Sequence, residues 1–245
     1  MPDQKSSRAN LFAFTLAGVF VAVAGGVGGW ILGTQGIGGK AATERVVHDY
    51  ILENPEILPE AMERLRADQT RKQLSAVSDE VTRAFPGAVL GNPNGTVTLV
   101  EFSDYACGFC RQSAADVEAL IAANPDLKVV VRELPILSPE SATAARMALA
   151  AAAQGKYAAF HNALFAAGKP TEAALAQAAQ TAGLDMARAR ASFADPAIAA
   201  EIESNLNLAS QLGFNGTPSW VVGDTVLSGA VGKDELARAI AAARR

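Results

Sequence analysis

The chain has 245 residues, half of them hydrophobic and 19% charged, with a formal net charge of −4. This composition excludes intrinsic disorder, and the negative balance lacks the basic footprint of a protein that binds nucleic acid. The two cysteines, Cys107 and Cys110, are too few for a disulfide-stapled scaffold or a four-cysteine zinc site.

The first feature along the chain is an uncharged stretch between Arg8 and Lys40. Its apolar part, residues 11–33, is long enough as a helix to cross a membrane core of about 30 Å. The Ala-Val-Ala sequence at residues 22–24 instead fits the cleavage site of a signal peptide. Residues 1–40 are therefore predicted to be a membrane anchor or a cleaved signal. The basic residues ahead of this segment place the rest of the chain in the periplasm.

Residues 41–86 change to a charged, helix-forming composition with apolar residues at helical intervals. The pairs Asn54-Pro55 and Leu58-Pro59 are expected to interrupt this helical arm, and its apolar spacing supports only a single heptad step. From the pattern alone, two alternatives stay open. The arm is either a linker helix that packs on the main domain or an oligomerisation arm.

Glycine- and proline-rich turns at residues 85–87 and 91–95 mark the start of a compact domain, residues 87–245. Residues 96–102 and 127–131 are apolar runs typical of buried strands, and a helical pattern lies between them. The domain therefore opens with a strand, a helix and a second strand.

The remainder of this domain begins with an almost entirely helical block, residues 138–212. A hairpin follows, with strands at residues 219–222 and 225–227, and a last helix covers residues 233–243. This order predicts an α/β fold in which a central mixed sheet carries the helical block as an insertion.

The cysteine pair lies where the first strand passes into a helix, at a spacing that places both thiols on one helical face. Unpaired N–H groups at a helix N-terminus favour an anion, so Cys107 is the candidate nucleophile. Cys110, one turn further on, is expected to be shielded and to act as the resolving thiol. An inert structural bridge is the alternative, but a bridge that closes so short a loop stabilises little.

A zinc site made of both cysteines with His48 and His161 is a second alternative to the redox pair. These two histidines are the only ones in the chain, and they lack the paired spacing of zinc-binding sequences. We therefore expect no metal and no organic cofactor.

The stretch from Val97 to Cys110, together with Gly216-Thr217-Pro218, resembles the DsbA branch of thioredoxin-fold thiol-disulfide oxidoreductases. The resemblance covers about residues 87–245. It implies a thioredoxin-like fold whose helical block is an insertion, and an enzyme that acts on protein cysteines.

The resemblance also implies roles for individual residues. Cys107 matches the nucleophile, Cys110 the resolving thiol, and Pro218 the cis-proline that faces the disulfide and leaves the Thr217 backbone free to pair with an extended substrate. Glu101 matches a buried acid beneath the pair, which would relay a proton to or from Cys110. A strand residue that faces solvent is the alternative for Glu101.

Two features depart from the type enzyme of this family. Gly108-Phe109 stands between the cysteines, where the type enzyme has a histidine before the second cysteine, so one source of thiolate stabilisation is absent. The threonine at position 217 resembles the disulfide isomerases and the ScsC-like proteins more than the type enzyme. The segment from Val46 to Leu65 resembles the amino-terminal region that makes some ScsC-like proteins trimeric, which favours an oligomerisation arm.

The sequence thus predicts a periplasmic thiol-disulfide oxidoreductase, with isomerase or reductase activity favoured. The alternatives are a DsbA-type dithiol oxidase and a copper-binding or chaperone module on the same scaffold. The expected partners are cysteine-containing protein substrates, a membrane or periplasmic redox partner, and further copies of the chain.

Overall fold

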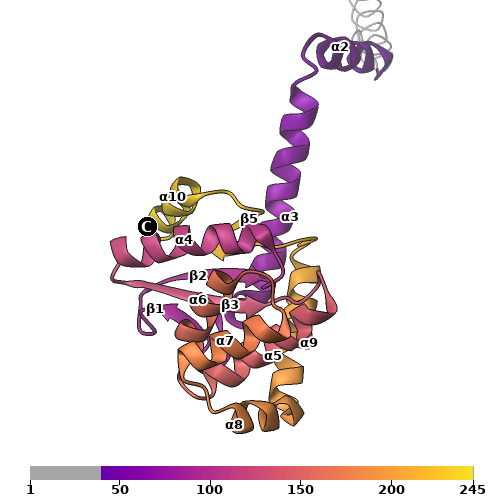
Figure 1. Cartoon of the computed structure of the whole chain (residues 1–245). Helices are drawn as coiled ribbons and strands as arrows, with labels where there is room; N and C mark the ends of the chain where they lie inside the picture. Colours follow the sequence, from indigo (N-terminus) through magenta and orange to yellow (C-terminus); the bar gives the residue numbers. More distant parts are fainter. Residues whose placement is uncertain (1–39, 245) are drawn as a thin grey trace, which may run out of the picture. The chain divides into compact units, whose positions relative to one another are not determined.

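The structure is a computed structural model that describes residues 40–244 (Figure 1). It contains two compact units, one that ends at Leu65 and one that begins at Arg66, so the division falls within helix α3 (Ile57–Thr82). The second half of α3 contributes the buried side chains of Leu74 and Val81 to the core of the second unit.

The first unit contains α2 (Lys40–Glu53) and the first turns of α3. Residues 54–56 separate the two helices, as the Asn54-Pro55 pair predicts. Leu58-Pro59 causes no interruption. Pro59 lies in the first turn of α3, where a backbone N–H has no helical partner in any case.

A five-stranded mixed sheet forms the centre of the second unit. It contains β1 (Val89–Gly91), β2 (Val97–Ser103), β3 (Leu127–Glu133), β4 (Ser219–Val222) and β5 (Thr225–Ser228), in the order β1-β3-β2-β4-β5. Only β2 and β3 pair in parallel. The predicted strand-helix-strand unit and hairpin are confirmed, and together they form a thioredoxin-like α/β sheet.

Strand β1 was not predicted from the sequence. It has three residues and lies at one edge of the sheet, where it pairs antiparallel with β3. Runs of turn-forming residues precede and follow it. A strand this short shows no alternation of apolar and polar residues, so only its partner strand defines it.

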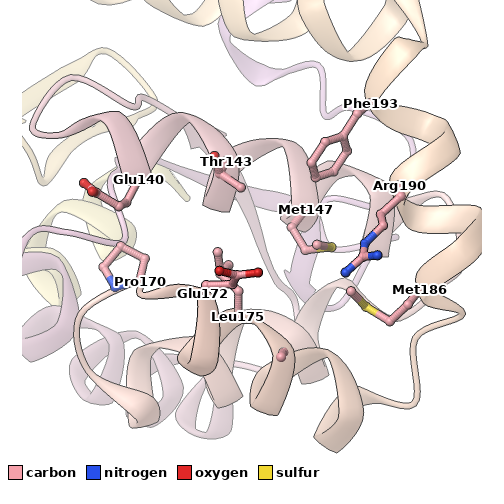
Figure 2. Close-up of a pocket in the computed structure, with 10 residues that line it drawn as sticks. Glu140, Thr143, Met147, Pro170, Glu172, Leu175, Met186, Arg190 and Phe193 are labelled. Carbon is pink, nitrogen blue, oxygen red and sulfur yellow. The ribbon is translucent and has the colours of Figure 1, made fainter.

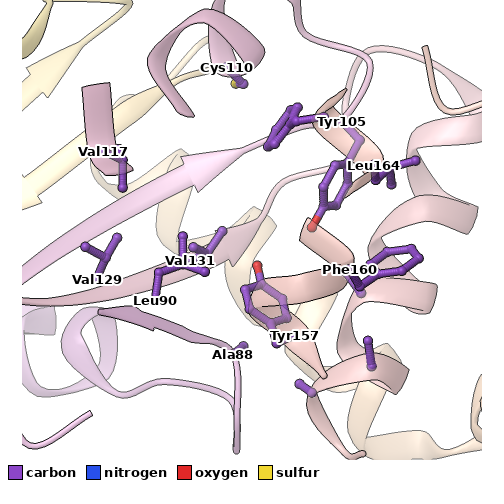
Figure 3. Close-up of a cluster of buried hydrophobic side chains, with 14 of the residues drawn as sticks. Ala88, Leu90, Tyr105, Cys110, Val117, Val129, Val131, Tyr157, Phe160 and Leu164 are labelled. Carbon is purple, nitrogen blue, oxygen red and sulfur yellow. The ribbon is translucent and has the colours of Figure 1, made fainter. Parts of the chain in front are cut away.

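Both faces of the sheet are buried. Successive residues of β2 point to opposite sides, and they belong to two different cores. Leu99 belongs to the core on the side of α4 (Gly108–Ala123) and α10 (Lys233–Ala243). Val100 belongs to a second core, which also contains side chains from α3 and α9. Figure 3 shows part of the first core, with Cys110 at its margin.

The predicted helical block is confirmed between β3 and β4. It consists of α5 (Pro139–Ala152), α6 (Tyr157–Ala167), α7 (Glu172–Ala182), α8 (Met186–Ala191), a short 3-10 turn at Ser192–Ala194, and α9 (Pro196–Gln211). Many of its buried residues are alanines, whose small side chains let the helices approach closely.

The predicted membrane segment, residues 11–33, lies outside the described residues. Between residues 40 and 244, no helix combines the length and the apolar character that crossing a bilayer requires.

Candidate active site

The cysteine pair lies at the N-terminus of α4, as predicted. Cys107 occupies the N-cap position and Cys110 lies in the first turn. Both are free thiols, with 6% of Cys107 exposed and none of Cys110. Both thiols are therefore buried, and only Cys107 keeps a small exposed surface.

Thr217 and Pro218 lie directly against this helix start. The Cys107 thiol donates a hydrogen bond to the Thr217 carbonyl over 3.2 Å, although 110 residues separate them in sequence. The pairing of β4 with β2 brings them together, since Ser219 lies opposite Phe102. The Thr217-Pro218 peptide bond is cis, as the family resemblance implies.

Glu101 is buried, with 1% of its surface exposed, so the solvent-facing alternative is wrong. It lies on β2 opposite Trp220, and neither carboxylate oxygen has a hydrogen-bond partner. Burial raises the pKa of Glu101 to about 7, an effect that the nearby Ser103 hydroxyl reduces. Burial, and then the charge of Glu101, raise the pKa of Cys110 far above its usual value.

Asp104 organises the loop before the cysteines, a role that the sequence did not reveal. Its carboxylate accepts a hydrogen bond from the Ala106 amide at 2.8 Å. The other oxygen accepts from the amides of Ile136 and Leu137 at 2.9 and 3.0 Å. The buried Asp104 carboxylate thus accepts three backbone hydrogen bonds, and two of them connect the active-site loop to the loop after β3. The only signal for it in the sequence was an aspartate at the end of an apolar strand.

A buried polar cluster behind this loop was also not predicted. The Tyr105 and Tyr157 hydroxyls both donate to one oxygen of Glu133, at 3.1 and 2.7 Å, and Tyr105 also lies 3.0 Å from Nδ1 of His161. Figure 3 shows the two tyrosine hydroxyls turned toward each other. Burial raises the pKa of Glu133 to about 8 and lowers that of His161 to about 3. The cluster joins the active-site loop to the helical insertion.

The two histidines have surroundings that do not suit a zinc site with the cysteines. His161 belongs to the buried cluster, and His48 lies exposed on α2 beside Asp49. Within residues 40–244, no three His, Cys, Asp or Glu side chains are grouped so that they could hold a metal ion.

Three exposed apolar side chains lie on the active-site helix and the loop that Asp104 anchors. Phe109, between the cysteines, is 63% exposed, and Ile136 and Leu137 are also exposed. Exposed apolar side chains beside a reactive group are a common feature of surfaces that bind polypeptides.

Replacing Glu101 by Gln should change how stability depends on pH. A carboxyl whose pKa rises from 4.5 to about 7 on folding stabilises the protein below pH 4.5, and this stabilisation is lost as the pH rises through 7. The Glu101→Gln variant cannot lose stability in this way. The difference between its free energy of unfolding and that of the wild type should therefore shift in the variant's favour by about 2 to 3 kcal/mol from pH 5 to pH 8.

Urea unfolding at the two pH values measures this difference. The control is Glu203→Gln, which removes an exposed carboxylate from α9 without altering a buried site. A difference between the Glu101→Gln variant and the wild type that stays the same at pH 5 and pH 8 would show that Glu101 is not a desolvated acid.

Comparison with known families gives two matches within the chain. The profile of the DSBA-like thioredoxin domain matches residues 98–241, and that of the copper resistance protein ScsC N-terminal domain matches residues 40–72. The first covers more than half of the chain, and the second covers α2 and more than half of α3.

Two solved structures show the same fold. A thioredoxin-like oxidoreductase from Silicibacter pomeroyi is 46% identical, with a TM-score of 0.61 over 64% of this chain and 91% of its own. A linker-deletion variant of ScsC from Proteus mirabilis is 25% identical, with a TM-score of 0.69 over 85% of this chain and 96% of its own.

A third match is to a much longer protein. A Na⁺/H⁺ antiporter, NhaA 3 from Salinispora tropica, is 32% identical over 137 residues, which is 55% of this chain. The match spans about a fifth of the length of that protein, 21%.

Proposed function

This chain belongs to the DSBA-like thioredoxin domain family, and we propose that it is a disulfide oxidoreductase that acts on protein cysteines in the periplasm, as an isomerase or reductase. The observation that carries this proposal is the position of Cys107. Its thiol lies at the N-terminus of α4 and contacts the Thr217 carbonyl, beside exposed apolar side chains.

The reaction begins with attack by the Cys107 thiolate on a substrate disulfide. A bond forms between Cys107 and one substrate sulfur, the substrate disulfide breaks, and the departing sulfur takes up a proton. Cys110 then attacks Cys107. This closes the Cys107–Cys110 disulfide and releases the second substrate thiol. The substrate gains two electrons and the enzyme loses two, so a membrane or periplasmic redox partner must reduce the enzyme again.

Glu101 supplies the base for the second step. The raised pKa of Cys110 keeps this thiol protonated, so it must lose a proton before it can attack. Glu101 points to the face of the sheet that α4 and Cys110 cover. Its pKa is about 7, so near neutral pH it can accept that proton and return it.

Thr217 and Pro218 form the contact surface for substrate. The Thr217 carbonyl that accepts the Cys107 thiol hydrogen bond is a backbone group two residues before β4. An extended substrate segment next to its reacting cysteine can pair with such a group, which orients the disulfide for in-line attack.

The isomerase preference rests on the first unit. Seven large apolar side chains there are between 50% and 68% exposed: Val46, Val47, Tyr50, Leu52, Leu58, Met62 and Leu65. They recur at helical intervals in α2 and the start of α3. We propose that they form the core of a homo-oligomer, a trimer in the ScsC-like arrangement. Several active sites held together suit the reshuffling of mispaired disulfides.

Replacing Leu58, Met62 and Leu65 together by Gln should break this assembly. All three are exposed on α3, so they add little to the stability of a single chain but form part of the proposed contact. Light scattering should show the mass falling from that of an oligomer to that of a monomer. The control is Leu206→Gln, an exposed apolar residue on α9. A wild-type chain that is already monomeric would contradict the proposed assembly.

The same triple variant tests the isomerase role. Reactivation of scrambled ribonuclease should fall several-fold per active site, while insulin reduction per site should stay close to the wild type, because the Cys107 site is intact. An equal fall in both activities would contradict an isomerase function that depends on assembly. Rapid oxidation of reduced ribonuclease without reshuffling would instead favour the dithiol oxidase.

A further inference from the structure

A groove leads from the active-site loop onto the helical insertion. It opens as a cavity of about 690 Å³ between the loop after β3 and the start of α7. Ala106, directly before Cys107, lines it together with Leu137, Glu140, Lys169 and Glu172. The first part of this groove therefore reaches the residue directly before the reactive cysteine.

A second cavity, of about 360 Å³, continues the groove across the insertion. The two cavities share Glu140, Pro170 and Glu172 in their walls. Figure 2 shows this second cavity, with Glu140 at the left of the view, Arg190 at the right and Glu172 between them. Of its four apolar side chains, Leu175 lies beside Glu172, and Met147, Met186 and Phe193 lie toward Arg190. We call the two cavities together the insertion groove.

The side chains that line the insertion groove change in character along its length. Glu140 and Glu172 lie in the first turns of α5 and α7, both exposed, and neither forms an ion pair within residues 40–244. Lys169 is the one cation among the residues that line the first cavity, and Arg190 is the one cation among those that line the second. Beyond the carboxylates, the methionines and Phe193 offer an adaptable apolar surface.

We propose that the insertion groove binds the polypeptide segment next to the substrate cysteine and selects substrates with a basic residue followed by a large apolar one. This rests on the proposed exchange at Cys107. A substrate chain that is joined to Cys107 by a mixed disulfide has its neighbouring residues at the mouth of the groove, because Ala106, directly before Cys107, lines the groove. An extended segment advances about 3.3 Å per residue, so a few residues carry it past the carboxylates.

The test uses a Cys110→Ala protein whose Cys107 carries 2-nitro-5-thiobenzoate as a mixed disulfide. A peptide thiolate attacks the Cys107 sulfur, forms the peptide–Cys107 disulfide and releases the coloured nitrothiobenzoate, so absorbance reports the rate. The peptides contain one cysteine and carry Lys, Gln or Glu at each of the four positions on either side. Lys should accelerate the reaction about three- to fivefold over Gln, at a few positions on one side only.

The matched variants separate the groove from general charge effects. Glu140→Gln with Glu172→Gln should abolish the difference between the Lys and Glu peptides. Glu203→Gln with Asp234→Asn removes the same charge from exposed helix positions outside the described cavities and should leave the difference intact. Ala176→Trp fills the second cavity from the exposed side of α7 and should remove a preference for Leu over Ser beyond the basic position.

Failure of the two proposals would look different. If no peptide displaces the nitrothiobenzoate, the proposed exchange at Cys107 is wrong. If all peptides react at the same rate, or if both pairs of charge variants reduce the Lys preference equally, exchange stands and the insertion groove does not select substrates.

Discussion

A Cys107→Ala variant is expected to lose insulin reduction by at least about a thousandfold, as other enzymes do when their nucleophile is removed. Cys110 cannot substitute for it. This thiol has no exposed surface, and burial together with the Glu101 charge raises its pKa. The rate of disulfide cleavage with dithiothreitol as reductant, measured by insulin turbidity, checks the prediction.

The control for this experiment is Cys110→Ala, which keeps the attacking thiol and loses the resolving one. It should accumulate a mixed disulfide with a substrate, visible as a higher mass on a non-reducing gel. A Cys107→Ala protein as active as the wild type would overturn the oxidoreductase mechanism and favour the binding-module alternative.

Replacing Arg132 by Met should destabilise the protein by about 3 to 5 kcal/mol, the usual cost of breaking a buried ion pair. Arg132 is 1% exposed and forms an ion pair with Glu201 at 3.1 Å. It also donates to the Asn205 side chain and to three carbonyls at the end of α3, those of Glu80, Val81 and Arg83. Its loss leaves these acceptors without their donor and the Glu201 charge without its partner.

Urea unfolding followed by circular dichroism measures this effect. Arg146→Met is the matched control, because Arg146 is exposed on α5. Adding Glu201→Gln to Arg132→Met should recover part of the loss, since the unpaired charge disappears. A loss below about 1 kcal/mol, typical of an exposed ion pair, would show that Arg132 does not fasten α3 to the sheet.

The elements with strong patterns were predictable. Strands β2 and β3, the helical block and the last helix follow the predicted residues closely, since long apolar or helical runs carry their own signal. Strand β1 and the start of the second unit at Arg66 were not predictable. Both depend on contacts with residues distant in sequence, so no local pattern marks them.

The site divides in the same way. The cysteine pair, Thr217 and Pro218 could be identified from motifs and resemblance. Asp104, Glu133 and their partners could not, because a buried carboxylate in a sequence looks the same as an exposed one. Their function depends on which donors surround them after folding.

The sequence by itself located the candidate redox pair, because two thiols three residues apart at a strand-to-helix junction have few other uses. Tertiary structure alone decided the environment of those thiols. The pairing of β4 with β2 placed the Thr217 carbonyl against Cys107, and the covering of the sheet by α4 and α10 buried Glu101 without a hydrogen-bond partner. Desolvation depends on every atom packed around a group, and those atoms come from the whole domain.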